Sequence, residues 1–205
     1  MGWKFTALPV ALVLALALVL PLLVSACGDL QKPAKDQQTV YADTTSASSK
    51  AERLISAFYS FESTQLAPLL LHAPESASAL LFYQGWAQGG NYKIVQRHPC
   101  VMTSASVARC SIQVDDDLVL ALNRAHKVTD TFTIRFAKGN ITAVETSSDD
   151  EPIYREAFDW VVESTPELMN RECVGFFDGG PTPAACARSM AEGYRRFIAQ
   201  HRVDQ

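Results

Sequence analysis

The sequence lacks any run of basic residues, and it lacks the short motifs typical of metal, phosphate and serine-hydrolase sites. Its 18 Lys and Arg against 22 Asp and Glu give a net charge of −4, so nucleic acid is not an expected partner. No C-x-x-C or H-x-x-x-H spacing occurs and the four histidines are scattered, so no metal site is expected. No G-x-S-x-G motif and no glycine loop after a strand is present, and we therefore expect no bound cofactor.

Disorder of the whole chain is also excluded, because 48% of the residues are hydrophobic and 9% are aromatic. There is no internal repeat and no low-complexity core. The chain has 205 residues, and the first 26 differ in composition from the rest. The remaining residues are enough for one domain, or for a domain with a tail.

Residues 1–26 are typical of a secretory signal peptide. Lys4 precedes an uncharged run rich in Leu, Val and Ala, which ends in the small residues Ser25 and Ala26. The sequence LVSAC at 23–27 resembles the lipobox of bacterial lipoproteins, in which a peptidase cuts before the cysteine and the thiol carries diacylglycerol. The resemblance implies that Cys27 becomes the first residue and bears acyl chains such as palmitate. The alternative is an uncleaved transmembrane helix, since an uncharged run of this length would span a bilayer.

This resemblance implies a protein of the bacterial cell envelope that faces the periplasm or the exterior. Its partner would be the membrane, through the lipid on Cys27, because two or more acyl chains anchor stably whereas one is marginal. Gly28 stands where some enterobacterial lipoproteins carry an Asp that retains them in the inner membrane, and Asp29 follows it, so the choice of membrane stays open. The polar residues after Cys27 show no apolar periodicity, and we predict a flexible tether over 27–45.

Four cysteines follow the lipobox, and an even number in an exported chain favours two disulfides. Three pairings are open, and we predict the local one, Cys100 with Cys110 and Cys173 with Cys186. The first pair flanks a segment that is predicted to be a hairpin turn between two strands. The second pair flanks a loop rich in Gly and Pro, which contains little that packs and so needs an external clamp.

Apolar spacing predicts two helices before the first strand. The first is predicted near residues 46–64, where apolar side chains recur at helical intervals. The second is predicted from Pro74 to the Gly89-Gly90 pair, because proline suits the first turn of a helix and glycine its end. Alternating apolar and polar residues then predict strands, around 92–94, 106–114, 131–136 and 141–146, with a hairpin turn at 138–140.

Helical spacing returns after the last strand. Pro152 lies in the first turn of one predicted helix. Thr182 and Pro183 are predicted as the cap and first residue of the last helix, whose apolar face comprises Ala187, Met190, Ala191, Tyr194, Phe197 and Ile198. We predict that residues 166–205, a disulfide-clamped loop and this helix, pack on a domain formed by 46–165.

Two helices followed by an antiparallel sheet that ends in the hairpin FTIRFAKGNITAVETSSDD resemble the nuclear transport factor two-like superfamily. That superfamily includes ketosteroid isomerase, scytalone dehydratase and SnoaL-type polyketide cyclases. The resemblance covers about residues 46–165. It implies an α+β fold, a helix-first cone in which a curved sheet wraps around a long helix and leaves a pocket open at one end. The C-terminal helical extension goes beyond the family's usual cone.

The resemblance also implies an acidic or histidine base in an apolar pocket, where burial raises the pKa of a carboxylate. No position here matches such a base residue by residue. His98 and His126 are the remaining catalytic candidates, and both are more typical of exposed loops. The other pocket candidates are Tyr59, Tyr83, Trp86, Tyr92, Phe132, Ile134 and Phe136. Of these, Tyr59, Tyr83 and Trp86 are more typical of a packed core than of a ligand site.

Two acidic stretches have structural explanations. Residues 115–117 lack the glycine and closing glutamate of an EF-hand, so we predict a solvated turn or the cap of a short helix rather than a calcium site. Residues 149–151 are predicted to be acids of the first turn that favour the dipole of the next helix.

Three functions stay open. We favour a non-catalytic, lipid-anchored module that binds a small apolar ligand or an envelope protein partner, because nothing in the sequence identifies a base. The alternatives are a proton-transfer enzyme (isomerase, dehydratase or cyclase) with an apolar substrate, and a structural lipoprotein with a filled core. A cavity of ~300 Å³ or more bounded by Phe132, Ile134 and Phe136 with Tyr59 or Tyr83 would support binding. Solid packing of those side chains would contradict that pocket and give first place to the structural protein.

Overall fold

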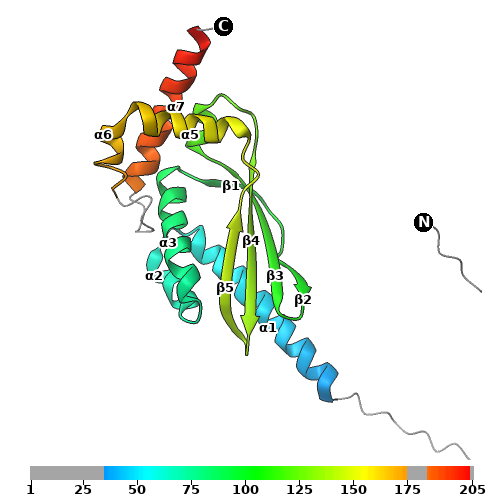
Figure 1. Cartoon of the computed structure of the whole chain (residues 1–205). Coiled ribbons are helices and arrows are strands. Elements are labelled where there is room, and N and C mark those ends of the chain that lie inside the picture. Colours follow the sequence, from blue (N-terminus) through cyan, green and yellow to red (C-terminus); the bar gives the residue numbers. More distant parts are fainter. Residues whose placement is uncertain (1–34, 175–183, 204–205) are drawn as a thin grey trace, which may run out of the picture. The chain divides into compact units, whose positions relative to one another are not determined.

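Helices and one antiparallel sheet form the described part of the chain, residues 35–174 and 184–203, in a computed structural model (Figure 1). The predicted α+β class is confirmed. The lipobox, and Thr182 and Pro183 before the last helix, lie outside the described residues. None of the described helices combines the length and the apolar character that crossing a membrane requires.

The elements follow the predicted order, with a few short helices added. The helices are α1 (Lys35–Phe58), α2 (Ser63–Leu66), the 3-10 helix η1 (Ala67–Leu70), α3 (Pro74–Gly89), α4 (Asp117–Ala121), α5 (Pro152–Ser164), α6 (Pro166–Met169) and α7 (Ala184–Val203). The strands are β1 (Lys93–Arg97), β2 (Val101–Ser104), β3 (Val107–Asp115), β4 (Val128–Ala137) and β5 (Asn140–Ser147).

The sheet has the strand order β1-β3-β4-β5, and β2 pairs with β3 beyond the end of β1. All pairs are antiparallel, and Val114 of β3 lies opposite Val128 of β4. The β4–β5 turn has positive φ at Lys138 (50°) and Gly139 (75°), as tight hairpin turns require. The predicted hairpin at 138–140 is therefore confirmed.

One face of the sheet carries the core. Every second residue of β4 is buried, because successive side chains of a strand point to opposite faces. Helix α1 crosses this face against β2 and β3, and α3 lies against β5 (Figure 1). Phe58 of α1 packs edge-to-face on Phe132 of β4, with ring centroids 5.0 Å apart. Burying a side chain of this size contributes about 2–3 kcal/mol.

Helix α1 differs from its prediction at both ends. It begins at Lys35, so residues 35–45, predicted as part of a flexible tether, are helical. No Gly or Pro occurs between Lys35 and Phe58, and nothing in the sequence stops a helix nucleated by the packed half. At the other end, Phe61 has a φ of 58°, which is incompatible with helix, so α1 stops short of residue 64.

The short helix α4 has a buried cap. Asp116 accepts hydrogen bonds from the backbone N–H groups of Leu118 and Val119 through Oδ1, both at 2.8 Å. The prediction of a helix cap within 115–117 is thus confirmed. Its Oδ2 is buried without a hydrogen-bond partner among the described residues, and burial raises the pKa of Asp116 to about 6.

Helix α7 lies at the centre of the helical contacts. It packs against α3, α4 and α5, and its predicted apolar face is buried except for the partly exposed Ile198. Gly193 brings it close to α5, since a Cβ there would lie 2.6 Å from Val161. Tyr194 packs edge-to-face on Tyr154 of α5 at 5.3 Å. The C-terminal helix therefore belongs to the same core as the helices that it contacts.

Both predicted disulfides are present. Cys100–Cys110 has an S–S distance of 2.06 Å and ties the start of β2 to β3, across the predicted hairpin. Cys173–Cys186 joins the segment after α6 to the first turn of α7. The two bonds therefore stabilise opposite parts of the fold, the sheet edge and the helical layer.

Candidate functional site

A buried carboxylate lies between the sheet and two helices. Asp130 of β4 is only 1% exposed, since it shares the inward face of the strand with Phe132 and Ile134. The hydroxyl of Tyr59, at the end of α1, donates to its Oδ2 at 2.6 Å. The hydroxyl of Tyr83, on α3, donates to its Oδ1 at 2.5 Å. Both carboxylate oxygens therefore have a partner, as buried charges require.

The environment of Asp130 changes its acidity. Burial raises its pKa to about 6, although the two tyrosine hydrogen bonds act in the opposite direction. The carboxylates of Asp150 and Asp149 act in the same direction as burial and contribute to this value. Asp130 is therefore ionised at neutral pH and takes up a proton under mildly acidic conditions.

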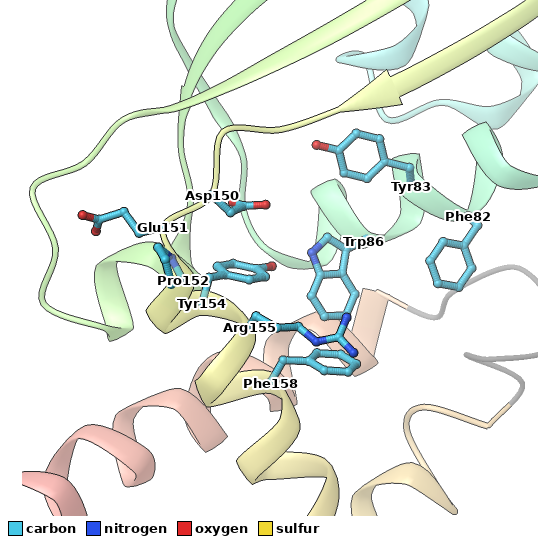
Figure 2. Close-up of a pocket in the computed structure, with 9 residues that line it drawn as sticks. All are labelled: Phe82, Tyr83, Trp86, Asp150, Glu151, Pro152, Tyr154, Arg155 and Phe158. Atoms are coloured by element: carbon cyan, nitrogen blue, oxygen red, sulfur yellow. The ribbon is translucent and has the colours of Figure 1, made fainter.

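A cleft opens beside this buried group, between α3 and the start of α5 (Figure 2). Its volume is about 490 Å³. Five aromatic side chains and three charged ones line it, and the full set is Phe82, Tyr83, Trp86, Asp150, Glu151, Pro152, Tyr154, Arg155 and Phe158. We call this the α3–α5 cleft. Its size and mixed lining fall within the range of small-molecule sites.

A second cavity of about 190 Å³ adjoins the cleft. It shares four of the lining residues with it: Tyr83, Trp86, Asp150 and Tyr154. It adds Tyr92 and the end of β5, at residues 146–148. The cleft therefore continues from the helices toward the sheet.

Two of the three charged residues of the cleft are paired. Glu151 accepts from the guanidinium of Arg124 at 2.7 and 3.3 Å. Arg155 forms an ion pair with Asp159 at 3.0 Å, and its guanidinium lies over the ring of Phe158, 5.5 Å from the centroid. These contacts compensate both charges within the protein.

Asp150 is different. It accepts a hydrogen bond from the hydroxyl of Ser148, and no cation lies within ion-pair distance of it among the described residues. Its carboxylate points toward the Trp86 side of the cleft (Figure 2). Partial desolvation and the neighbouring Asp149 raise the pKa of Asp150, whereas the hydrogen bond from Ser148 and the charge of His126 act in the opposite direction. A carboxylate without an ion pair favours a positively charged group beside it.

The structure brings together only part of the predicted pocket. Tyr83 and Trp86 line the cleft, and Tyr92 lines the adjoining cavity. The other four candidates belong to the packed interior, where Phe132 contacts the rings of Phe58 and Tyr59. These four are Tyr59, Phe132, Ile134 and Phe136. Phe58 and Tyr59 pack on Phe132 of β4, so the inward side chains of this strand belong to the core. The cleft is formed instead by α3 and by the start of α5 with the residues before it.

The two candidate histidines lie outside this lining. His98 is exposed in the β1–β2 loop. His126 is half-buried before β4, and its Nε2 lies 3.1 Å from the carbonyl oxygen of Asp149. Asp149 also accepts from the backbone N–H of Thr129 at 2.6 Å, so it fixes a loop instead of serving the first turn of α5.

Sequence reasoning missed Asp130 and Asp150. A signal for Asp130 was present, because the alternation of β4 puts it in phase with the buried Phe132 and Ile134. A polar residue on the inward face of a strand predicts a buried site that needs partners. For Asp150 no such local signal exists, since it follows the last strand in a polar loop.

Comparison with known protein families, with curated proteins and with solved structures gives no significant match. Within residues 35–174 and 184–203, no group of three or more His, Cys, Asp or Glu side chains is arranged to hold a metal ion. The α3–α5 cleft and the buried carboxylate beside it are therefore the features that bear on function.

Proposed function

We propose that this chain is a lipid-anchored envelope protein whose domain binds a small, mainly apolar ligand in the α3–α5 cleft. The observation that carries the proposal is the cleft itself, about 490 Å³ in volume and lined by five aromatic side chains. Binding sites of this size bury most of a small ligand against aromatic walls and orient it with a few polar groups. Here Asp150, Glu151 and Arg155 would provide those groups.

The lipid anchor depends on the lipobox-like sequence at 23–27. Acylation of Cys27 would hold the domain at a membrane, and the first helix of the described residues begins eight residues later at Lys35. Cys27→Ser should leave the leader uncleaved and remove the acyl chains, which mass spectrometry of the intact protein measures. A cleaved, acylated Cys27→Ser chain would contradict this part of the proposal, and so would a wild-type chain that retains its leader.

The filled interior of the sheet supports a structural protein, because the strand residues predicted to bound a pocket are packed. The α3–α5 cleft lies elsewhere and is open, and a purely structural role does not require it. Binding therefore accounts for more of the geometry than a structural role does.

A titration with a neutral apolar probe tests binding. The chain has three tryptophans, Trp3 in the leader, Trp86 in the cleft and Trp160 on α5. Trp160→Phe leaves Trp86 as the reporter of the processed protein, and 4-phenylbutanol should change its fluorescence in a saturable way. The matched variant Trp86→Phe, which keeps Trp160, should show no saturable change. If the probe produces no saturable change in the first variant, the proposed function is wrong.

Proton-transfer catalysis is a second candidate, and one observation favours it. Tyr83 lines the cleft while its hydroxyl donates to Asp130, whose pKa is raised to about 6, so one hydrogen bond connects a wall of the cleft with a buried acid. Against it, Asp130 does not line the cleft, and both its oxygens are occupied. Asp130-dependent exchange of deuterium from D₂O into apolar carbonyl compounds would favour the enzyme over the binding module.

A further inference from the structure

We propose that the α3–α5 cleft selects organic cations, ligands with an apolar body and a positively charged amino or ammonium group that is placed against Asp150. The inference rests on the proposed function, since it names the class of ligand for the same cleft. It is carried by three observations: the aromatic lining, the pairing of the other charges, and the position of the Asp150 carboxylate.

The aromatic lining favours a positive charge. Aromatic faces carry negative electrostatic potential, and a cation within about 6 Å of a ring centroid is attracted to it. The chain already uses this attraction at the edge of the cleft, where the Arg155 guanidinium lies 5.5 Å from the centroid of Phe158. The remaining walls present rings from two helices, Tyr83 and Trp86 from α3 and Tyr154 from α5 (Figure 2).

Among the three charged residues that line the cleft, Asp150 is the one without an ion pair within the described part of the chain. Glu151 is neutralised by Arg124, and Arg155 by Asp159. Asp150 has a hydroxyl donor, Ser148, and no ion pair among the described residues. A cationic ligand would supply the missing partner. An anionic ligand would have to compete with Asp159 for Arg155 while facing Asp150.

Asp150 also acts on the groups around the cleft. Its negative charge contributes to raising the pKa of Asp116, Asp130, Tyr154 and Tyr194. Its charge is therefore close enough to act on a wall of the cleft, Tyr154, and on the buried acids behind it. Asp116 and Asp130 are buried and Asp150 is exposed at the cleft, and a bound cation would lower the repulsion among these three carboxylates.

The test compares three probes with one phenylbutyl body and different charges: 4-phenylbutylamine, 4-phenylbutanol and 4-phenylbutyrate. Each is titrated into the processed, acylated Trp160→Phe protein at pH 7, with Trp86 fluorescence as the readout. We expect the amine to bind about tenfold more tightly than the alcohol, from cation–π attraction and one ion pair. The carboxylate should bind more weakly than the alcohol.

Two variants distinguish a direct contact between the ligand and Asp150 from the general effect of negative charge in the loop before α5. Asp150→Asn should reduce the amine-to-alcohol ratio to about twofold, because only the aromatic contribution remains. Asp149→Asn removes the same charge one residue away, outside the lining of the cleft, and should leave most of the preference. Circular dichroism checks that both variants are folded.

Different outcomes would contradict different parts of the proposal. Equal binding of the three probes, or tightest binding of the carboxylate, would overturn the cation preference and leave the proposed binding function standing. An unchanged ratio in Asp150→Asn would overturn the role of Asp150. If none of the probes binds, the proposed function fails and this inference fails with it.

Discussion

The interior behind β4 and the α3–α5 cleft are both formed by aromatic rings and a carboxylate, but the interior is packed whereas the cleft is open. Behind β4, Tyr59 and Tyr83 satisfy both oxygens of Asp130, and the surrounding rings pack at 4.9–5.2 Å. In the cleft, Asp150 has no cationic partner among the described residues, and about 490 Å³ remains open. The carboxylate of Asp130 is satisfied within the protein and serves the fold, whereas that of Asp150 faces open space, where we propose that it meets a ligand.

Truncating one ring in each region gives the largest contrast. Phe132 is fully buried against Phe58 and Tyr59, so Phe132→Ala should cost about 3–5 kcal/mol in the free energy of unfolding. Phe82 is half-buried at the wall of the cleft, and Phe82→Ala should cost about 1 kcal/mol. Urea unfolding measures both. Similar losses for the two variants would show that the cleft is packed as tightly as the interior.

The buried acids should make stability fall as the pH rises. In the folded protein the pKa of Asp130 is raised to about 6 by burial, from about 4 in the unfolded chain. The folded state therefore holds the proton more tightly, and the stability present below pH 4 is lost as the pH rises to 6. The loss should reach about 3 kcal/mol for this group, and Asp116 should add to it.

Asp130→Asn isolates that contribution. An asparagine can still bond both tyrosine hydroxyls, so the fold is kept while the titration is removed. The free energy of unfolding of the variant should vary less between pH 4 and 6 than that of the wild type. Glu163→Gln, which removes an exposed carboxylate from α5, serves as the control and should follow the wild type. An unchanged slope in Asp130→Asn would mean that Asp130 is not the titrating group.

The two disulfides should have similar effects on stability but different effects on the cleft. Each closes a short loop, of 10 and 13 residues, so removing either pair with serine should cost about 2–3 kcal/mol. Only Cys173–Cys186 holds α7, which packs on both walls of the cleft, α3 and α5. Its removal should weaken probe binding, and removal of Cys100–Cys110 should not. Equal effects on binding would show that α7 does not support the cleft.

The sequence predicted those features that depend on local patterns. The alternation in 131–136 and the turn at 138–140 identified the β4–β5 hairpin, and cysteine spacing identified both disulfides. The partners of Asp130 lie 71 and 47 residues away on two different helices, so no local pattern links them. The cleft depends on α3 and α5 being held by α7, which is a tertiary arrangement. The N-terminal part of α1 was missed because polar helices and polar coils have similar compositions.

Tyr83 connects the two regions, and a pair of hydroxyl deletions tests that connection. Tyr83→Phe and Tyr59→Phe each remove one hydrogen bond to Asp130, and each should cost about 1–2 kcal/mol by leaving a carboxylate oxygen unpaired. Each should also raise the pKa of Asp130, since both bonds lower it.

Binding should distinguish the two deletions. Only Tyr83 lines the α3–α5 cleft, so Tyr83→Phe should alter the affinity for the phenylbutyl probes several-fold while Tyr59→Phe leaves it nearly unchanged. Unfolding curves and probe titrations on the same samples measure both effects. If Tyr59→Phe changed binding as much as Tyr83→Phe, the buried carboxylate itself would be part of the binding site, and the division between a filled interior and an open cleft would not hold.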